Sequence, residues 1–247
     1  MSAETFFTAA YKENSGNQTL SPEKSKQLRQ LLPSLFSSLQ LNSVLDCGCG
    51  TTCLHTVFSD SLGVKYLGTD IVKPLVANLQ TTQSTQNCKF QYMDVFQDPP
   101  ESTDLWIARD LLNLYPDSQH LLFFQRFLES GSMYLALTSI DTTTENSAGV
   151  IGIQRRMNLQ APPYSMPEPL VSLLDGQQWF CTKKLLVYSR SQIESWLPTL
   201  ATPPISSELI PQALDDIQDR NAHLTTNVRL RDVKLGDHMG LSGPKSS

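Results

Sequence analysis

The sequence lacks any apolar run long enough to cross a membrane, and it carries little charge. A membrane-spanning helix needs about 18 or more consecutive apolar residues, and no such run occurs in the 247 residues. The chain begins Met1-Ser2-Ala3 with no basic segment followed by an apolar one, so we expect no secretory signal. Charged residues make up 17% of the chain, and the net charge is −5. Proteins that bind nucleic acid need a basic surface, so nucleic acid is not the expected partner.

Cysteine is also scarce, and its spacing does not match a metal site. The five cysteines are Cys47, Cys49, Cys53, Cys88 and Cys181. An odd number in a chain without a secretory signal is typical of reduced thiols, so we expect a cytoplasmic protein. The first three lie close together, but no second group of ligands follows at the spacing of a zinc site. No metal is therefore expected.

Short apolar segments alternate with segments of helical length through the middle of the chain. The intervals between them are long enough for the crossover helices that parallel strands require. The pattern therefore predicts an α/β fold: a Rossmann-like, mostly parallel sheet with helices on both faces. The segments that we expect to form its strands are 43–45, 65–69, 89–93, 104–108 and 132–138.

Further elements are expected around this pattern. A Ser-Pro start followed by leucines at helical spacing predicts a helix from Ser21 to Phe36. Closely spaced prolines between residues 162 and 169 exclude a helix or a central strand there. The remaining assignments are a helix at 121–128, a strand at 185–188, a short helix at 191–197, an N-terminal arm at 1–20, a proline-rich insertion or lid at 141–180, and a C-terminal extension at 201–247 with a helix and a flexible tail.

Acidic residues follow three successive predicted strands, and two glycines follow the first of them. Asp46, Asp70 and Asp94 are these acids, and Gly48 and Gly50 are the glycines. In an open α/β sheet, ligands bind beyond the carboxyl ends of the strands, and glycine lets the backbone turn sharply close to a ligand. Asp70 is placed to accept hydrogen bonds from the hydroxyls of a ribose, and Asp94 to meet an adenine amino group. The arrangement predicts a nucleoside cofactor.

A dinucleotide is the obvious alternative ligand for a glycine turn after a first strand. Its fingerprint is G-x-G-x-x-G, in which the third glycine allows close packing of helix on strand. Residues 48–53 read G-C-G-T-T-C, so the third glycine is missing. The phosphate-binding P-loop motif is absent as well. NAD and FAD are therefore disfavoured.

Four segments resemble the motifs of class I S-adenosylmethionine-dependent methyltransferases. Residues 44–50, with the sequence V-L-D-C-G-C-G, resemble the first motif, D-x-G-x-G. Residues 66–71 resemble the second motif, 92–95 the third, and 104–110 the motif of the fourth strand. The resemblance covers about residues 25–140 and implies that S-adenosylmethionine is the cofactor.

The resemblance also implies roles for particular residues of a methyltransferase domain, which we place at 21–200. In the family, the glycine turn packs on the methionine portion of the cofactor, and the acidic residue of the second strand holds the ribose. Arg109 is expected to contact the cofactor carboxylate or to line the acceptor pocket. By this resemblance, the residues that bind the cofactor are Asp46, Cys47, Gly48, Gly50, Asp70, Ile71, Asp94, Val95 and Arg109.

Methyl transfer to a hydroxyl group also requires a group that takes up the proton. Asp110 is the best-placed candidate and Asp141 the next. A carboxylate is a weak base unless desolvation raises its pKa, and Asp110 alternatively caps the helix that follows. His120 is a third candidate, but it lies in a predicted helix on which we expect it to face solvent.

A narrower resemblance concerns the acceptor. Residues 109–114, 158–164 and 167–170 resemble a bacterial group of orphan methyltransferases associated with the methylation of glycans and sugars. This predicts methylation of a hydroxyl group on a small molecule or a glycan. Two alternatives stay open: a protein methyltransferase that acts on a side chain, and a non-catalytic binding module with a methyltransferase-like fold. The extension at 201–247, which the resemblance does not cover, motivates the second.

Overall fold

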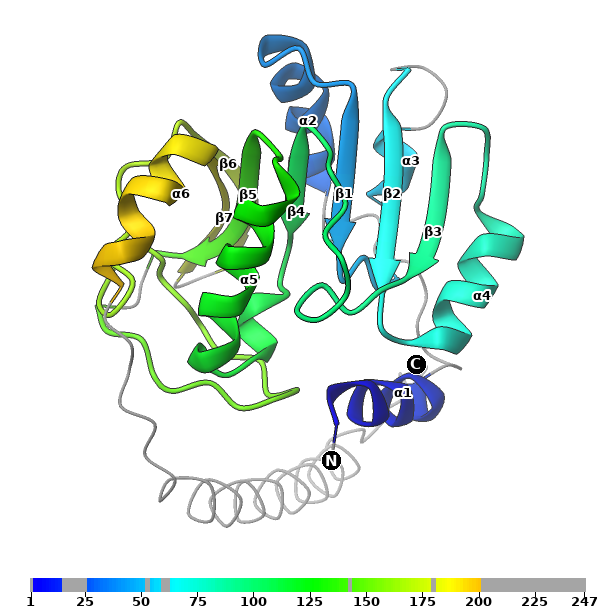
Figure 1. The fold of residues 1–247 in the computed structure, drawn as a ribbon, viewed down its shortest axis with the longest axis horizontal. Coiled ribbons are helices and arrows are strands. Elements are labelled where there is room, and N and C mark those ends of the chain that lie inside the picture. The colour runs from blue at the N-terminus through cyan, green and yellow to red at the C-terminus, as the bar shows by residue number, and fades with distance from the viewer. Residues whose placement is uncertain are drawn as a thin grey trace, which may run out of the picture. The chain divides into compact units, whose positions relative to one another are not determined.

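The described chain is built around a sheet of seven strands in the order β3-β2-β1-β4-β5-β7-β6 (Figure 1). Strands β1 to β5 pair in parallel, whereas β7 pairs antiparallel with both β5 and β6. The strands are β1 (Ser43–Cys47), β2 (Lys65–Asp70), β3 (Cys88–Tyr92), β4 (Leu105–Ala108), β5 (Tyr134–Ile140), β6 (Val171–Gln178) and β7 (Cys181–Ser189). The computed structural model describes residues 2–14, 26–51, 54–58, 63–141, 144–178 and 181–200.

Helices cover both faces of this sheet, as the sequence predicts. Side chains from α2, α3 and α4 share one cluster of buried apolar residues with the sheet, and those from α5 and α6 share a second cluster. Figure 1 shows α5 and α6 in front of the sheet. The predicted Rossmann-like, mostly parallel fold is therefore confirmed. These helices are α2 (Lys26–Ser38), α3 (His55–Phe58), α4 (Lys73–Thr82), α5 (Asp117–Ser130) and α6 (Arg190–Trp196).

The elements expected from apolar periodicity are present in the described chain. The five predicted strands correspond to β1 to β5, and the late strand at 185–188 forms the second half of β7. Strand β4 is buried along its whole length, as expected for a strand covered on both faces. At the start of α6, the Ser189 side chain accepts a hydrogen bond from the backbone N–H of Gln192, and the Gln192 side chain accepts one from the backbone N–H of Ser189. This reciprocal cap explains why the helix begins there.

Two elements were not predicted as such. Residues 1–20 were expected to be an arm, but they contain the helix α1 (Ala3–Asn14). The proline-rich insertion was expected to reach residue 180, but β6 begins at Val171, directly after the prolines. The pairing register of β6 shifts between Leu174 and Gly176, and the residue between them is a buried aspartate. An acid and a glycine inside this strand interrupt the apolar pattern that normally reveals a strand.

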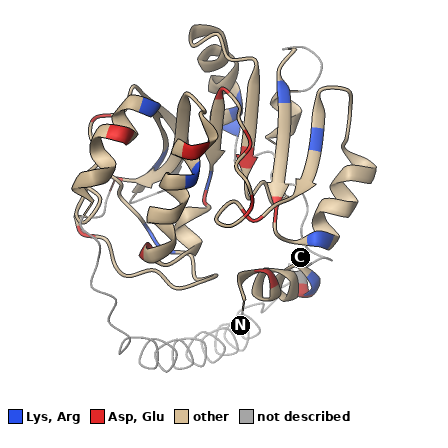
Figure 2. Ribbon diagram, viewed as in Figure 1, with Lys and Arg blue, Asp and Glu red and all other residues tan. Residues whose placement is uncertain are grey.

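Some expectations fall on parts of the chain that the structure does not describe. The C-terminal extension at 201–247 lies outside the described residues, and so does the helix start predicted at Ser21. Among the described helices, none is both long and apolar enough to cross a membrane. Figure 2 shows that Lys and Arg in the described segments are scattered over several elements and form no continuous basic stretch.

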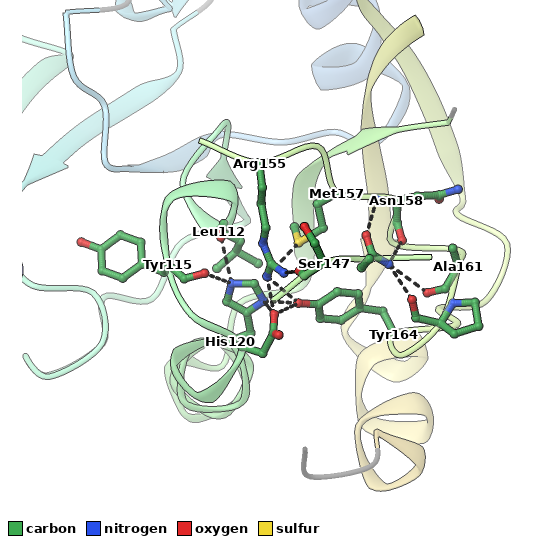
Figure 3. Close-up of polar contacts among 12 residues, drawn as sticks. Leu112, Tyr115, His120, Ser147, Arg155, Met157, Asn158, Ala161 and Tyr164 are labelled. Atoms are coloured by element: carbon green, nitrogen blue, oxygen red, sulfur yellow. Dashed lines mark hydrogen bonds and ion pairs between the residues drawn. The ribbon is translucent and has the colours of Figure 1, made fainter. Parts of the chain in front are cut away.

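His120 lies inside the protein, so the expectation that it faces solvent was wrong. Its side chain is completely buried, because α5 turns the same side toward the core as it does with Phe123, Phe124 and Phe127. One ring nitrogen lies 2.7 Å from the Tyr164 hydroxyl, and the other lies 2.8 Å from the carbonyl oxygen of Leu112 (Figure 3). Burial dominates the surroundings of the ring and lowers the pKa of His120 to about 4.

The Tyr164 hydroxyl is the centre of this buried polar network. It donates to Asp117 over 2.6 Å, and it lies 3.0 Å from a guanidinium nitrogen of Arg155, which also pairs with Asp117 (Figure 3). Backbone hydrogen bonds join the same two segments: Gly152 N–H donates to the carbonyl of Leu114 over 2.8 Å, and Arg155 N–H donates to that of Asn113 over 3.1 Å. The network and these bonds fasten the proline-rich insertion to the loop that follows β4.

We expect Tyr164→Phe to destabilise the fold by about 1–3 kcal/mol, because it leaves buried partners of the hydroxyl without a hydrogen bond. Urea unfolding followed by circular dichroism measures the change. The matched control is Tyr92→Phe, which removes a hydroxyl bonded to Glu4 at the surface and should have a much smaller effect. Equal effects of the two substitutions would contradict the role given to the buried network.

Candidate functional site

A cavity of about 310 Å³ opens at the carboxyl ends of the parallel strands. Its walls come from the loops after β1, β2, β3 and β4 and from α1. This is the edge at which ligands bind in open α/β sheets. The residues that line it are Phe7, Ala10, Tyr11, Gly48, Cys49, Gly50, Thr51, Asp70, Ile71, Val72, Leu75, Met93, Asp94, Val95, Phe96, Arg109, Asp110, Leu111, Leu114 and Tyr115.

The turn after β1 requires glycine at two positions. Gly48 and Gly50 have φ angles of +67° and +54°, in the left-handed region that side chains disfavour. A Cβ atom on Gly48 would also lie only 2.8 Å from Cδ1 of Leu111, which belongs to the loop after β4, and this is too close for two carbon atoms. The backbone therefore passes close to the loop after β4 without a side chain in between. The predicted glycine turn thus borders the cavity.

Asp70 fixes this turn to the end of β2. Its carboxylate accepts hydrogen bonds from the backbone N–H groups of Gly50, over 3.0 Å, and of Val72, over 2.9 Å. Burial raises the pKa of Asp70, and the backbone hydrogen bonds partly oppose that shift. Each carboxylate oxygen has a second lone pair. Asp70 can therefore hold the turn and still accept hydrogen bonds from a ligand.

Asp94 and its neighbours form the wall that follows β3. The Asp94 carboxylate accepts hydrogen bonds from the backbone N–H of Phe96, over 3.0 Å, and from the side chain of Gln97, over 2.6 Å. These contacts fix the loop in which Val95 lies. Ile71 adds an apolar surface from the end of β2.

Asp46 and Cys47 do not line the cavity, although both belong to the motif that resembles a cofactor site. Cys47 is completely buried in the core. Asp46 is 1% exposed and accepts a hydrogen bond from the Tyr66 hydroxyl over 2.7 Å. Desolvation raises the pKa of Asp46 to about 6, against the hydrogen bond from Tyr66 and the charge of Arg109. In this structure Asp46 is a buried residue of β1 bonded to β2, just before the glycine turn.

Arg109 and Asp110, which follow β4, form ion pairs with residues of β6 and β7, the two strands beyond β5 in the sheet. Arg109 Nε lies 2.8 Å from the carboxylate of Asp175 on β6. Lys183 on β7 pairs with Asp110 and lies 3.1 Å from Asp175. Asp110 has a φ of +61°, and its backbone N–H donates to the hydroxyl of Thr138 over 2.8 Å. The sequence contains no motif that would have marked Asp175 or Lys183, because only the sheet order brings them to β4.

The two carboxylates proposed as proton acceptors lie in different places. Asp110 lines the cavity. Asp141 follows β5, does not line the cavity, and pairs with Lys184 over 3.1 Å. The geometry therefore favours Asp110 over Asp141 as a group that meets a ligand.

Helix α1 contributes cavity walls that the sequence did not reveal as such. Phe7 and Tyr11 line the cavity, and the ring of Phe7 lies 5.7 Å from that of Tyr115. An ion pair of 2.9 Å between Glu4 and Lys73 joins α1 to α4. Aromatic residues in an otherwise polar segment hinted that this segment packs on the protein, but their spacing does not reveal that they line a cavity.

Comparison with known proteins gives matches by structure, while no family profile and no curated protein matches the chain by sequence. Magnesium protoporphyrin IX methyltransferase from Synechocystis PCC 6803, solved with bound S-adenosylmethionine, is similar over 77% of this chain and 98% of its own, at 16% identity and a TM-score of 0.50. The 1,6-didemethyltoxoflavin-N1-methyltransferase from Burkholderia thailandensis matches 75% of this chain and 86% of its own, at 13% identity and a TM-score of 0.57. The chain therefore has the fold of S-adenosylmethionine-dependent methyltransferases.

The buried Asp46 makes stability depend on pH. Because folding raises its pKa from the ordinary 3.8 to about 6, the folded state loses stability as pH rises through this interval. We expect the stability of Asp46→Asn relative to that of the wild type to rise by roughly 2 kcal/mol between pH 4 and pH 6. Urea unfolding of both proteins across this range measures the difference. A difference that stays constant with pH would contradict the assignment.

Proposed function

We propose that this protein is an S-adenosylmethionine-dependent methyltransferase that methylates a hydroxyl group of a small molecule or glycan. The observation that carries the proposal is one cavity at which the left-handed glycine turn and Asp70 meet. A turn without side chains and a carboxylate with free lone pairs suit the amino acid portion and the ribose of one nucleoside cofactor. The methyltransferase fold supports the same reading.

The residues of the cavity fit this cofactor. Its volume, about 310 Å³, lies at the lower end of the range of small-molecule sites. Asp70 would hold the ribose, and the wall formed by Ile71, Asp94 and Val95 would receive the adenine. Gly48 and Gly50 would lie along the methionine portion, and Arg109 would attract its carboxylate. Asp46 and Cys47 would act from behind the turn.

When bound, S-adenosylmethionine supplies a methyl group that its sulfonium already activates. The protein then has to orient the acceptor, which in favourable cases contributes roughly 7–11 kcal/mol. Asp110 is the carboxylate that the cavity offers to an acceptor hydroxyl, and we propose that its oxygens take up the hydroxyl proton. Phe7 and Tyr11 line the cavity from α1 and would contribute an apolar surface there.

Asp70→Ala should weaken the binding of S-adenosylhomocysteine by about tenfold to a hundredfold, because hydrogen bonds to a charged group contribute about 1.5–3 kcal/mol each. Isothermal titration calorimetry measures this. Asp141→Ala is the control, since Asp141 is a carboxylate away from the cavity and should leave the affinity unchanged. Absence of binding to the wild type, or equal binding by Asp70→Ala, would refute the proposed cofactor site.

Arg109→Met tests which end of the cofactor Arg109 meets. We expect the affinity for S-adenosylhomocysteine to fall by about tenfold, the effect of one charge-assisted hydrogen bond. The affinity for 5′-methylthioadenosine, which lacks the amino acid portion, should hardly change. Calorimetry with both ligands gives the comparison, and the second ligand controls for a general disturbance of the site. Equal losses for both ligands would argue against a contact between Arg109 and the cofactor carboxylate.

A further inference from the structure

Four charged residues, two after β4 and one each on β6 and β7, form ion pairs with one another beside the cavity. Arg109 and Asp110 follow β4, Asp175 lies on β6, and Lys183 lies on β7. We call these four residues the charge quartet. Each cation contacts both carboxylates: Arg109 lies 2.8 Å from Asp175 and 3.6 Å from Asp110, and Lys183 pairs with both. The two positive and two negative charges balance within the quartet.

One oxygen of each carboxylate in the quartet has no hydrogen-bond donor among the described residues. Both Oδ1 of Asp110 and Oδ1 of Asp175 are buried and accept no hydrogen bond from the described part of the chain. Asp175 is only 2% exposed. Buried carboxylate oxygens normally have a donor, so each orphaned oxygen calls for an explanation. Among the described residues, no side-chain nitrogen of Arg109 or Lys183 is both buried and without a hydrogen-bond partner.

Two of the four residues of the quartet belong to the wall of the cavity. Arg109 and Asp110 line it, together with the glycine turn and Asp70, and Asp175 and Lys183 lie behind them as their ion-pair partners. The Asp110 side chain is about one quarter exposed, and its backbone is anchored on Thr138. A ligand group that reaches this wall therefore meets the Asp110 carboxylate, whose partners Arg109 and Lys183 also pair with Asp175.

We propose that the charge quartet recognises the methyl acceptor, and that the acceptor presents to it an uncharged or cationic hydrogen-bond donor, a hydroxyl or an amine. This inference rests on the proposed function and names the chemistry of its acceptor. A hydroxyl or amine donates to a carboxylate and brings no negative charge. Among the described residues that line the cavity, Arg109 is the only lysine or arginine, and it pairs with Asp175 and is proposed to meet the cofactor carboxylate. An acceptor carboxylate or phosphate would therefore lie beside Asp110 with no further cation to neutralise it, and unpaired buried charges are strongly disfavoured.

The proposal is tested with the full chain saturated with S-adenosylhomocysteine and with four probes that share one skeleton: benzyl alcohol, benzylamine, benzoate and benzyl phosphate. Saturation-transfer NMR measures the binding of each probe. We expect the alcohol and the amine to bind about tenfold more tightly than the two anions, the effect of one charge-assisted hydrogen bond. Tighter binding of an anion, or no preference among the four probes, would overturn the proposal.

Variants locate the preference in the quartet. Asp110→Asn should reduce the preference for the amine over benzoate, and Asp175→Asn provides a second variant with the same expectation. Lys184→Gln is the matched control, because Lys184 is the neighbour of Lys183 on β7 but pairs with Asp141. A preference that survives both aspartate substitutions would assign it to other residues and overturn the proposal.

Calorimetry and the NMR measurement distinguish failure of the proposed function from failure of the inference about the acceptor. If calorimetry finds no binding of S-adenosylhomocysteine, the proposed function fails. If the cofactor product binds but the probes show no preference for donors, the proposed function stands and the inference about the acceptor fails.

Discussion

The hydrogen bond from the Gly50 backbone to the Asp70 carboxylate joins the two loops that build the cavity. It ties the end of β1 to the end of β2, and it depends on a backbone that only glycine adopts easily at positions 48 and 50. Because the strands are parallel and adjacent, their carboxyl ends meet at one edge of the sheet. The loops after β3 and β4 then complete the walls at the same edge.

Burial of charge is the second constraint on this edge. Asp46 is buried behind the turn with the Tyr66 hydroxyl as its hydrogen-bond donor, and desolvation raises its pKa. Farther along the edge, Asp175 is buried between Arg109 and Lys183. Several charged groups are therefore gathered at the edge where a ligand would bind. The proposed division of labour is that the β1–β2 side receives the cofactor and the β6–β7 side receives the acceptor.

Local sequence was enough to predict the parts of this arrangement that depend on local physics. Apolar runs of strand length predicted β1 to β5, and the glycines and aspartates at their ends marked the edge that carries the cavity. It was not enough for contacts that depend on strand order. The pairing of Asp175 and Lys183 with residues after β4 requires β7 and β6 to follow β5 in the sheet. The burial of His120 was not predicted, because its position in a helix does not reveal the Tyr164 hydroxyl and the Leu112 carbonyl that satisfy its ring nitrogens in the core.

The central claim is that the cavity at the glycine turn binds S-adenosylmethionine. A crystal structure of the chain with S-adenosylhomocysteine tests it most directly. The account predicts the ribose hydroxyls on the Asp70 carboxylate, the methionine portion along Gly48 and Gly50, and the sulfur atom facing the wall that contains Asp110. A ligand bound elsewhere, or bound in this cavity with its ribose away from Asp70, would contradict it.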